Sequence, residues 1–159
     1  MPEFNQKSDT RKGLLKYAVN ILSRRPYFRN TLKDKLLYRA KREKFENSEE
    51  EIKKILDELA ASGYLDDVYL AQAFVRRQIA KNYGPRIITL KLKQLHLDSG
   101  AIKSAIASEA TKELQVEAIA KFAAKNGRVD KRKLSYKIYS RGFSSDIIKY
   151  VFDETEFPD

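Results

Sequence analysis

The stretch 63–97 constrains the fold more than any other part of the chain, because it predicts two helices separated by a clear break. Gly84-Pro85 interrupts the helical pattern, and a proline fits the first turn of a new helix, where its missing N–H leaves nothing unsatisfied. Apolar residues recur at i, i+3 and i+4 spacing on both sides of this break: Leu70, Ala71, Phe74, Val75, then Ile88, Leu92, Leu95. The spacing therefore predicts one helix before Gly84 and a second from Pro85.

The residues that precede the first of these helices are typical of the end of one helix followed by the beginning of the next. Gly63 can adopt the left-handed conformation that closes a preceding helix, and Asp66 or Asp67 can accept hydrogen bonds from the N–H groups that open the next. Paired carboxylates are also used by metal-dependent nucleases, but negative charge is favoured at the start of a helix. We therefore interpret Asp66 and Asp67 as structural caps.

The same three-helix pattern occurs three times along the chain, which indicates a degenerate tandem repeat. Ser48 followed by Glu51 matches a capping box, Gly127 and Gly142 are expected to end helices in the last repeat, and no strand-like alternation competes. Small three-helix units gain buried surface by stacking on their neighbours. We predict an all-α protein whose three modules form an elongated, curved array: a flexible N-terminus at 1–9, module 1 at 10–65 with a helix opened by Thr10, module 2 at 66–110, module 3 at 111–154 and a C-terminal tail at 155–159.

Composition excludes several classes of function. The chain has no cysteine and one histidine, His96, so it can form neither a disulfide nor a thiolate metal site, and His96 is more readily a turn residue than a metal ligand. No glycine-rich loop precedes a Lys-Ser/Thr pair, as a phosphate-binding loop would require. The N-terminus lacks the apolar segment of a signal peptide, and no run is long enough to span a membrane. We expect a soluble cytoplasmic protein that is not an enzyme and needs no cofactor or metal.

Basic residues are the strongest sign of a binding surface. The net charge of +10 favours an anionic partner, such as nucleic acid or an acidic protein surface. Any single lysine or arginine on a helical protein is usually only solvated, so the argument depends on clustering. The candidate contact residues lie mostly between positions 76 and 93, with a second group in module 1: Arg76, Arg77, Lys81, Arg86, Lys91, Lys93, and Arg24, Arg25. Tyrosines near these groups and in module 3 are candidates either for base stacking or for packing between helices.

Five segments of the chain stand out as motifs. GYLDD, AFVRR and YGPRI lie in the middle of the chain, KLSYKIYSRGFSSDIIKYVFDE lies near the C-terminus, and AVNILSRRPYFRNTLKDKL lies near the start. Together they resemble the RecX family of bacterial proteins, the last of them more loosely. His96 departs from the pattern, because members of the family often have a glycine there. The resemblance covers most of the chain and implies the same plan of three tandem three-helix modules.

This resemblance also implies a function. RecX proteins regulate the RecA recombinase, so a similar chain is expected to bind the RecA–single-stranded DNA filament as a monomer and to inhibit its ATPase, strand-exchange and SOS co-protease activities. Single-stranded DNA would be a direct partner, with double-stranded DNA as a further candidate. The alternative is a transcription regulator, because three-helix modules with a basic helix can imitate helix-turn-helix units and bind specific duplex sequences.

Overall fold

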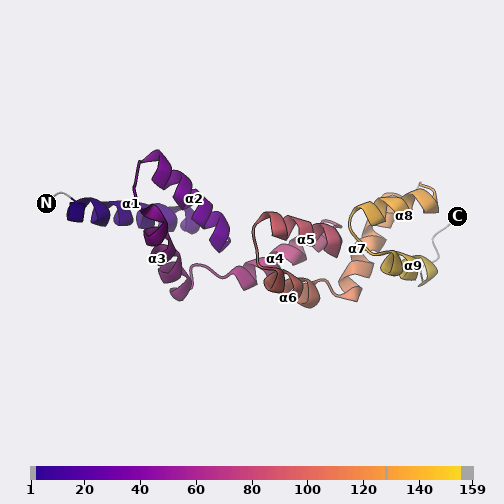
Figure 1. The fold of residues 1–159 in the computed structure, drawn as a ribbon. Coiled ribbons are helices and arrows are strands. Elements are labelled where there is room, and N and C mark those ends of the chain that lie inside the picture. The colour runs from indigo at the N-terminus through magenta and orange to yellow at the C-terminus, as the bar shows by residue number, and fades with distance from the viewer. Residues whose placement is uncertain (1–2, 128, 155–159) are drawn as a thin grey trace. The chain divides into compact units, whose positions relative to one another are not determined.

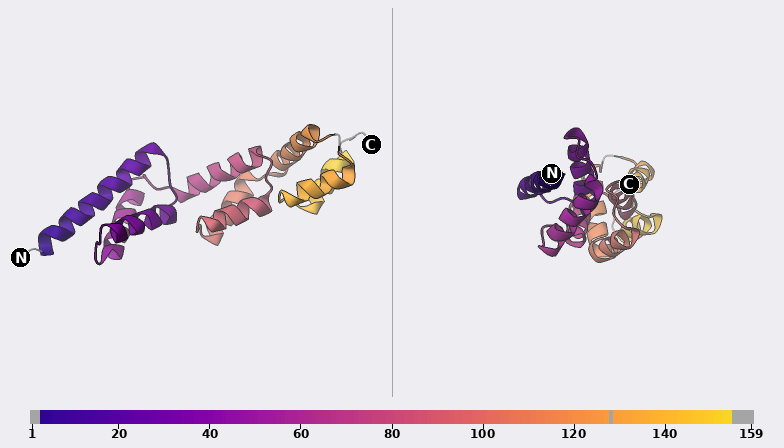
Figure 2. Two further views of the ribbon diagram at one scale, coloured as in Figure 1. Left: turned by 90° about the horizontal axis from the view of Figure 1, so that it is seen from above. Right: turned by 60° about the vertical axis from the view of Figure 1, so that its left-hand side comes forward.

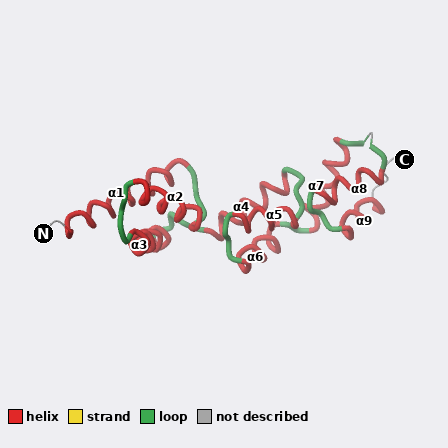
Figure 3. The backbone as a smooth tube through the Cα atoms, turned by 45° about the horizontal axis from the view of Figure 1, so that its top comes forward, coloured by secondary structure: helices red, strands yellow, loops and turns green. Residues whose placement is uncertain are grey.

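All regular structure in the described part of the chain is helical, as predicted. The computed structural model of this protein describes residues 3–127 and 129–154, and the predicted tail at 155–159 lies outside them. Figure 3 shows helices joined by loops, with no strand in these residues. Their order in Figure 1 is α1 (Glu3–Arg24), α2 (Arg29–Arg42), α3 (Ser48–Ala61), α4 (Asp67–Ala80), α5 (Pro85–Gln94), α6 (Ser99–Glu109), α7 (Lys112–Lys125), α8 (Lys131–Ser140) and α9 (Ser145–Glu154).

The first helix begins earlier than the sequence pattern predicted. α1 starts at Glu3 rather than at Thr10, so the segment assigned to a flexible N-terminus is helical from its third residue. No glycine or proline lies between Glu3 and Thr10, and a helix that is already nucleated extends at low cost through residues of ordinary propensity. The absence of an apolar stripe in this segment therefore did not mark a boundary.

The chain divides into two compact units, Met1–Leu70 and Ala71–Asp159, which we call unit 1 and unit 2. In unit 1, α1, α2 and α3 pack against one another, as can be followed in Figures 1 and 2. Their apolar stripes meet in a core that includes Leu14, Leu32, Leu36, Ile52 and Ile55, all fully buried. All three helices of unit 1 therefore contribute fully buried side chains to one core.

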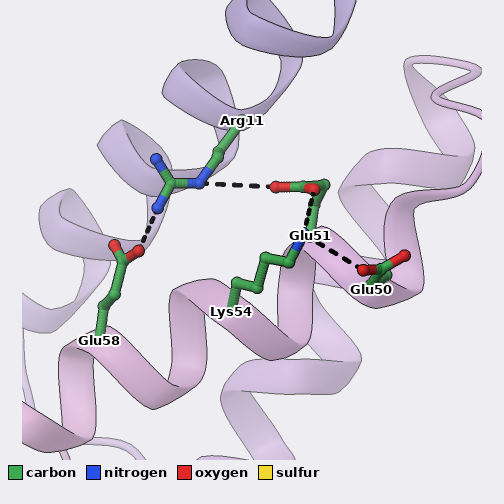
Figure 4. Close-up of polar contacts among 5 residues, drawn as sticks. All are labelled: Arg11, Glu50, Glu51, Lys54 and Glu58. Atoms are coloured by element: carbon green, nitrogen blue, oxygen red, sulfur yellow. Dashed lines mark hydrogen bonds and ion pairs between the residues drawn. The ribbon is translucent and has the colours of Figure 1, made fainter.

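An ion-pair network at the surface joins α1 to α3 in unit 1 (Figure 4). The Arg11 guanidinium pairs with Glu58, and its Nε lies 3.5 Å from Glu51 Oε2. Lys54 Nζ lies 3.0 Å from Glu51 and 3.2 Å from Glu50. Hydrogen bonds to Glu51 and Glu50 raise the pKa of Lys54 above its usual value.

The capping box predicted at Ser48 is wrong. Asn47 is the N-cap of α3, its backbone is left-handed (φ 54°), and no side chain caps the helix there. Ser48 is the first helical residue, and Glu51 extends toward Arg11 and Lys54 instead of turning back on the helix start. The capping-box signature is present in the sequence, but the Glu51 carboxylate that the box requires is held by ion pairs with Arg11 and Lys54 instead.

Several helices end in the same hydrogen-bonded turn, whether or not a glycine is available. After α3, Gly63 has φ 76°, and the N–H of Tyr64 donates to Leu59 O at 2.9 Å. After α5, His96 takes the corresponding position with φ 57°, and the N–H of Leu97 donates to Leu92 O at 3.3 Å. Both are Schellman endings, in which the left-handed residue lets the chain reach back to the last carbonyls. His96 is therefore a turn residue, as expected.

Unit 2 contains the rest of α4 and the helices α5 to α9. α5 packs on α6, and α7, α8 and α9 pack against one another. The buried residues of α4 in this unit are Ala71, Val75, Gln78 and Ile79, and those of α5 are Ile88 and Leu92. Within the part of the chain that the structure describes, no helix has both the length and the apolar character that crossing a bilayer demands.

Candidate functional site

The two aspartates at the start of α4 hold two different helices. Asp66 Oδ1 accepts a hydrogen bond from the N–H of Tyr69 at 2.9 Å, so Asp66 caps α4. Asp67 Oδ1 accepts instead from the backbone N–H of Arg29 at 2.8 Å, which is the first N–H of α2. The expectation that either aspartate would open α4 is thus corrected for Asp67, whose side chain points across unit 1. Both carboxylates bind backbone N–H groups, and no group of three His, Asp or Glu among the described side chains is placed to hold a metal ion.

Arg29 itself is a structural residue of unit 1. Its Nη1 donates to Leu56 O at 3.0 Å, and its Nη2 pairs with Asp57. Arg29 therefore attaches the beginning of α2 to α3 through its side chain and to the beginning of α4 through its backbone N–H. This arginine is not free to bind a partner.

Two of the candidate cations lie exposed at the C-terminal end of α4. Arg77 is in the last turn of the helix, and Lys81 directly follows its last residue, Ala80. Neither side chain makes an ion pair, a hydrogen bond or a ring contact with the described residues. We call these two residues the α4 edge. Arg76 differs from them, because its Nη1 lies 2.8 Å from Oε2 of Glu109, a carboxylate that is largely buried.

The start of α5 is held by the turn that follows α8. The N–H of Gly84 donates to Arg141 O at 2.8 Å, and the N–H of Arg86 donates to Gly142 O at 3.1 Å. The first N–H groups of a helix have no partner within it, so these two carbonyls do for α5 what a capping side chain does elsewhere. We call the contact of Gly84–Ile87 with Arg141–Phe143 the α5–α8 junction.

Both glycines at the α5–α8 junction are required by its close approach. A Cβ on Gly84 would lie 2.3 Å from the carbonyl carbon of Gly142 and from the nitrogen of Phe143. A Cβ on Gly142 would lie 2.6 Å from the nitrogen of Ile87, and Gly142 also has φ 98°. The glycines that the sequence marked as helix stops thus serve a second purpose, which is to let two backbones touch.

Two arginines reinforce the α5–α8 junction from opposite sides. The Arg86 guanidinium lies 4.2 Å from the centre of the Tyr139 ring and donates to Tyr139 O at 3.4 Å. Arg141 Nη1 donates to Lys81 O and Asn82 O, both at 3.2 Å, which are carbonyls at the end of α4. The Arg141 guanidinium also stacks near the rings of Phe122 and Tyr83, at 4.6 and 5.0 Å. Sequence reasoning missed Arg141, although a basic residue next to a helix-ending glycine often binds C-terminal carbonyls.

The remaining candidates also divide into engaged and unengaged side chains. Lys91 Nζ donates to Gln78 Oε1 at 2.7 Å and lies 3.7 Å from the centre of the Tyr83 ring. In unit 1, Arg25 Nε donates to the Tyr27 hydroxyl at 2.8 Å. Lys93 and Arg24 are exposed and make no such contact with described residues. Of the eight candidate cations, Arg25, Arg76, Arg86 and Lys91 have internal partners, whereas Arg24, Arg77, Lys81 and Lys93 have none in the described part of the chain.

Several known proteins with similar sequences are described as the regulatory protein RecX. No family model matches the chain. The regulatory protein RecX of Thermus thermophilus is 36% identical over 130 residues, which are 81% of this chain and 82% of that protein. The regulatory protein RecX of Chromobacterium violaceum is 30% identical over 145 residues and is covered to 89%. That of Leuconostoc mesenteroides is 29% identical over 155 residues, but the chain spans only 55% of its length.

Solved structures agree with these sequences. The crystal structure of RecX from Lactobacillus salivarius matches with a TM-score of 0.78 at 25% identity, over 92% of this chain and 97% of that one. A second crystal structure of a regulatory protein RecX matches with a TM-score of 0.76 at 26% identity, over 92% of this chain and 73% of that one. Because the chain also covers 82% of a RecX protein that is 36% identical to it, it belongs to the RecX family of regulatory proteins.

Proposed function

We propose that this chain regulates the RecA recombinase by binding the RecA–single-stranded DNA filament, and that its effect is to inhibit ATP hydrolysis, strand exchange and co-protease activity. Membership of a family of regulatory proteins supports a regulatory role. The partner and the direction of the effect come from the resemblance of the sequence to that family. The observation that carries the contact with DNA is the α4 edge, where Arg77 and Lys81 are exposed and unpaired among the described residues.

The α4 edge is suited to phosphates because binding would break no internal interaction. A phosphate competes with the internal partner of an arginine or lysine that already has one, whether that partner is a carboxylate or an amide oxygen. Arg76 would lose Glu109, and Lys91 would lose Gln78. Arg77 and Lys81 would lose only water, so their contacts with phosphate should contribute their full counterion-release free energy. Lys93 and Arg24 are the next candidates by the same criterion.

This proposal needs no catalytic group, cofactor or metal from the chain. The protein would act as a monomer through contacts with the filament, and its partners would place it in the cytoplasm. Asp66 and Asp67, the carboxylate pair nearest to a nuclease motif, accept backbone hydrogen bonds from Tyr69 and Arg29. Inhibition would therefore arise from a change in the filament rather than from cleavage of its DNA.

The deciding experiment adds the protein to preformed RecA filaments on single-stranded DNA and follows ATP hydrolysis. We expect the rate to fall as the protein is titrated, and the Arg77→Ala/Lys81→Ala variant to need a higher concentration for the same effect. Lys12→Ala/Lys16→Ala is the matched control, since it removes two exposed lysines at the same i, i+4 spacing from α1. An unchanged rate at saturating protein would contradict the proposal. Sequence-specific binding to duplex DNA without any effect on RecA would favour the transcription-regulator alternative.

A further inference from the structure

An open groove of about 820 Å³ runs between α8 and α9 in unit 2. Its floor is apolar, formed by Ile148 and Phe152, which are 3% and 8% exposed. Arg132, Tyr136 and Tyr139 line it from α8 at i, i+4 and i+7 spacing, so they form one stripe on that helix. The groove is within the volume range of small-ligand sites, and it is open enough to admit part of a polymer.

Among the described aromatic rings that line this groove, Tyr136 is the one that has no cation against it. The Tyr139 ring is covered by the Arg86 guanidinium at 4.2 Å, and the Phe152 ring has the Lys131 ammonium at 5.6 Å. Tyr136 is 74% exposed and has no ring contact or hydrogen bond with the described residues. A large exposed ring over an apolar floor provides a flat surface for a second planar group to stack on.

Cations outnumber carboxylates among the residues that line the groove. Lys131, Arg132 and Lys149 line it, and the two acidic residues that line it are Asp130 and Asp153. Asp130 Oδ2 is already engaged with the backbone N–H of Lys133 at 3.3 Å, as the cap of α8. Lys133 and Lys137 add two exposed cations on the same helix. A ligand that combines planar apolar rings with repeated negative charge would match both the ring and the cations.

We propose that the α8–α9 groove binds single-stranded nucleic acid through its bases, with one base stacked on Tyr136 and the adjacent phosphates near Arg132 and Lys149. This inference rests on the proposed contact with single-stranded DNA, and it adds a second surface of a different kind. The α4 edge would neutralise phosphates only, whereas the groove would hold a base that has left its stack. Stacking is tolerant of sequence because every base has a π-face, so the groove should not select one base strongly.

The test compares two fluorescein-labelled strands of equal length, one of thymidylate and one of abasic sites, by anisotropy with the full-length protein alone. Tyr136→Ala should weaken binding of the thymidylate strand by roughly 5- to 150-fold, as expected for the loss of one base stack. Tyr136→Phe keeps the ring and should bind within about two-fold of the unmodified protein. Tyr38→Ala is the matched control, because Tyr38 is 71% exposed on α2 and outside the groove, and it should bind normally.

The abasic strand separates this inference from the wider proposal. Tyr136→Ala and the unmodified protein should bind the abasic strand equally, because the phosphate contacts remain. If Tyr136→Ala and the unmodified protein bind the thymidylate strand equally, the groove is not a base site. A groove that receives a protein segment instead of DNA would give this result. An equal loss of binding to both strands would also overturn the proposal. The effect on RecA-dependent ATP hydrolysis is measured separately, so its absence would remove the proposed regulation without changing the outcome for the groove. A thermal melt of each variant confirms that the exposed substitutions leave the fold intact.

Discussion

The α4 edge and the α5–α8 junction are both basic, yet their cations have opposite surroundings. At the α4 edge, Arg77 and Lys81 point into solvent without a partner among the described residues. At the junction, Arg86 and Arg141 each bind backbone carbonyls and lie against aromatic rings. The two groups cannot be told apart by charge or by residue type. What separates them is whether a helix end and a ring lie within reach, which is a property of the tertiary structure.

The beginnings of α2, α5 and α8 extend this comparison. The first N–H of α2 is bound by Asp67, which follows it by 38 positions. The N–H groups at the start of α5 are bound by the Arg141 and Gly142 carbonyls. α8 uses the adjacent side chain of Asp130. Three helices that hold the same place in the predicted repeat thus meet the same requirement in three ways, of which only the last is local in sequence.

The largest effect should come from breaking the α5–α8 junction at Gly142. Gly142→Ala places a Cβ against the Ile87 backbone and forces an alanine to φ 98°, so we expect a loss of roughly 3 kcal/mol or more in the free energy of unfolding. The measurement is chemical denaturation followed by circular dichroism. Gly13→Ala is the control, because a Cβ there meets nothing within 4 Å and should stabilise α1 by about 0.5–1 kcal/mol. A native-like stability for Gly142→Ala would mean that the junction is not closely packed in solution.

Most of the fold could be predicted from the sequence because its signals are local. Apolar spacing located the helices, and Gly84-Pro85 lies at the break between α4 and α5 as predicted. The capping of α2 by Asp67 and the contact of Gly84 with Gly142 could not be predicted, because nothing in a helical pattern says which distant loop a helix end will meet. The same limit applies to the candidate site. The sequence predicted the same binding role for Arg76 and Arg77, whereas in the structure Arg76 pairs with Glu109 and Arg77 is exposed without an ion pair to a described residue.

The next effect in size concerns Asp66 and Asp67. Because they cap different helices, each should contribute about 1 kcal/mol, with up to about 2 kcal/mol lost in Asp66→Ala/Asp67→Ala. Asp67→Asn retains a carbonyl oxygen that can accept from the Arg29 N–H, so it should lose much less than Asp67→Ala. Chemical denaturation of the single and double variants gives the free energies of unfolding that test both expectations. A double variant with native stability that no longer inhibits RecA would show that the pair belongs to a site rather than to the fold.

Arg141 should give a smaller loss. Arg141→Ala removes hydrogen bonds to Lys81 O and Asn82 O and two ring contacts, but part of this surface is open to water. We expect a loss of about 1–2 kcal/mol in the free energy of unfolding, with Arg141→Lys intermediate, because lysine keeps the charge without the planar fork. Thermal unfolding of the three proteins in parallel tests this order. Equal stability of all three proteins would show that Arg141 does not stabilise the junction, and Arg141 would then become a candidate binding residue.

The smallest effect on stability, and the sharpest contrast with the junction, should come from the α4 edge. Arg77→Ala/Lys81→Ala removes two exposed cations with no partner among the described residues, so the free energy of unfolding should change by no more than about 0.5 kcal/mol. Binding to single-stranded DNA should nevertheless weaken, and the slope of log K against log salt should flatten by about 1.4, since each neutralised phosphate contributes about 0.7. The loss should be similar for different DNA sequences, because phosphate contacts carry no base information. Lys12→Ala/Lys16→Ala lowers the net charge equally and should leave the slope unchanged if the contact is local to α4. If both double variants flatten the slope alike, the overall charge of +10 attracts the DNA, and no particular edge does. Arg24 and Lys93 would then be no better candidates for DNA contact than other exposed cations.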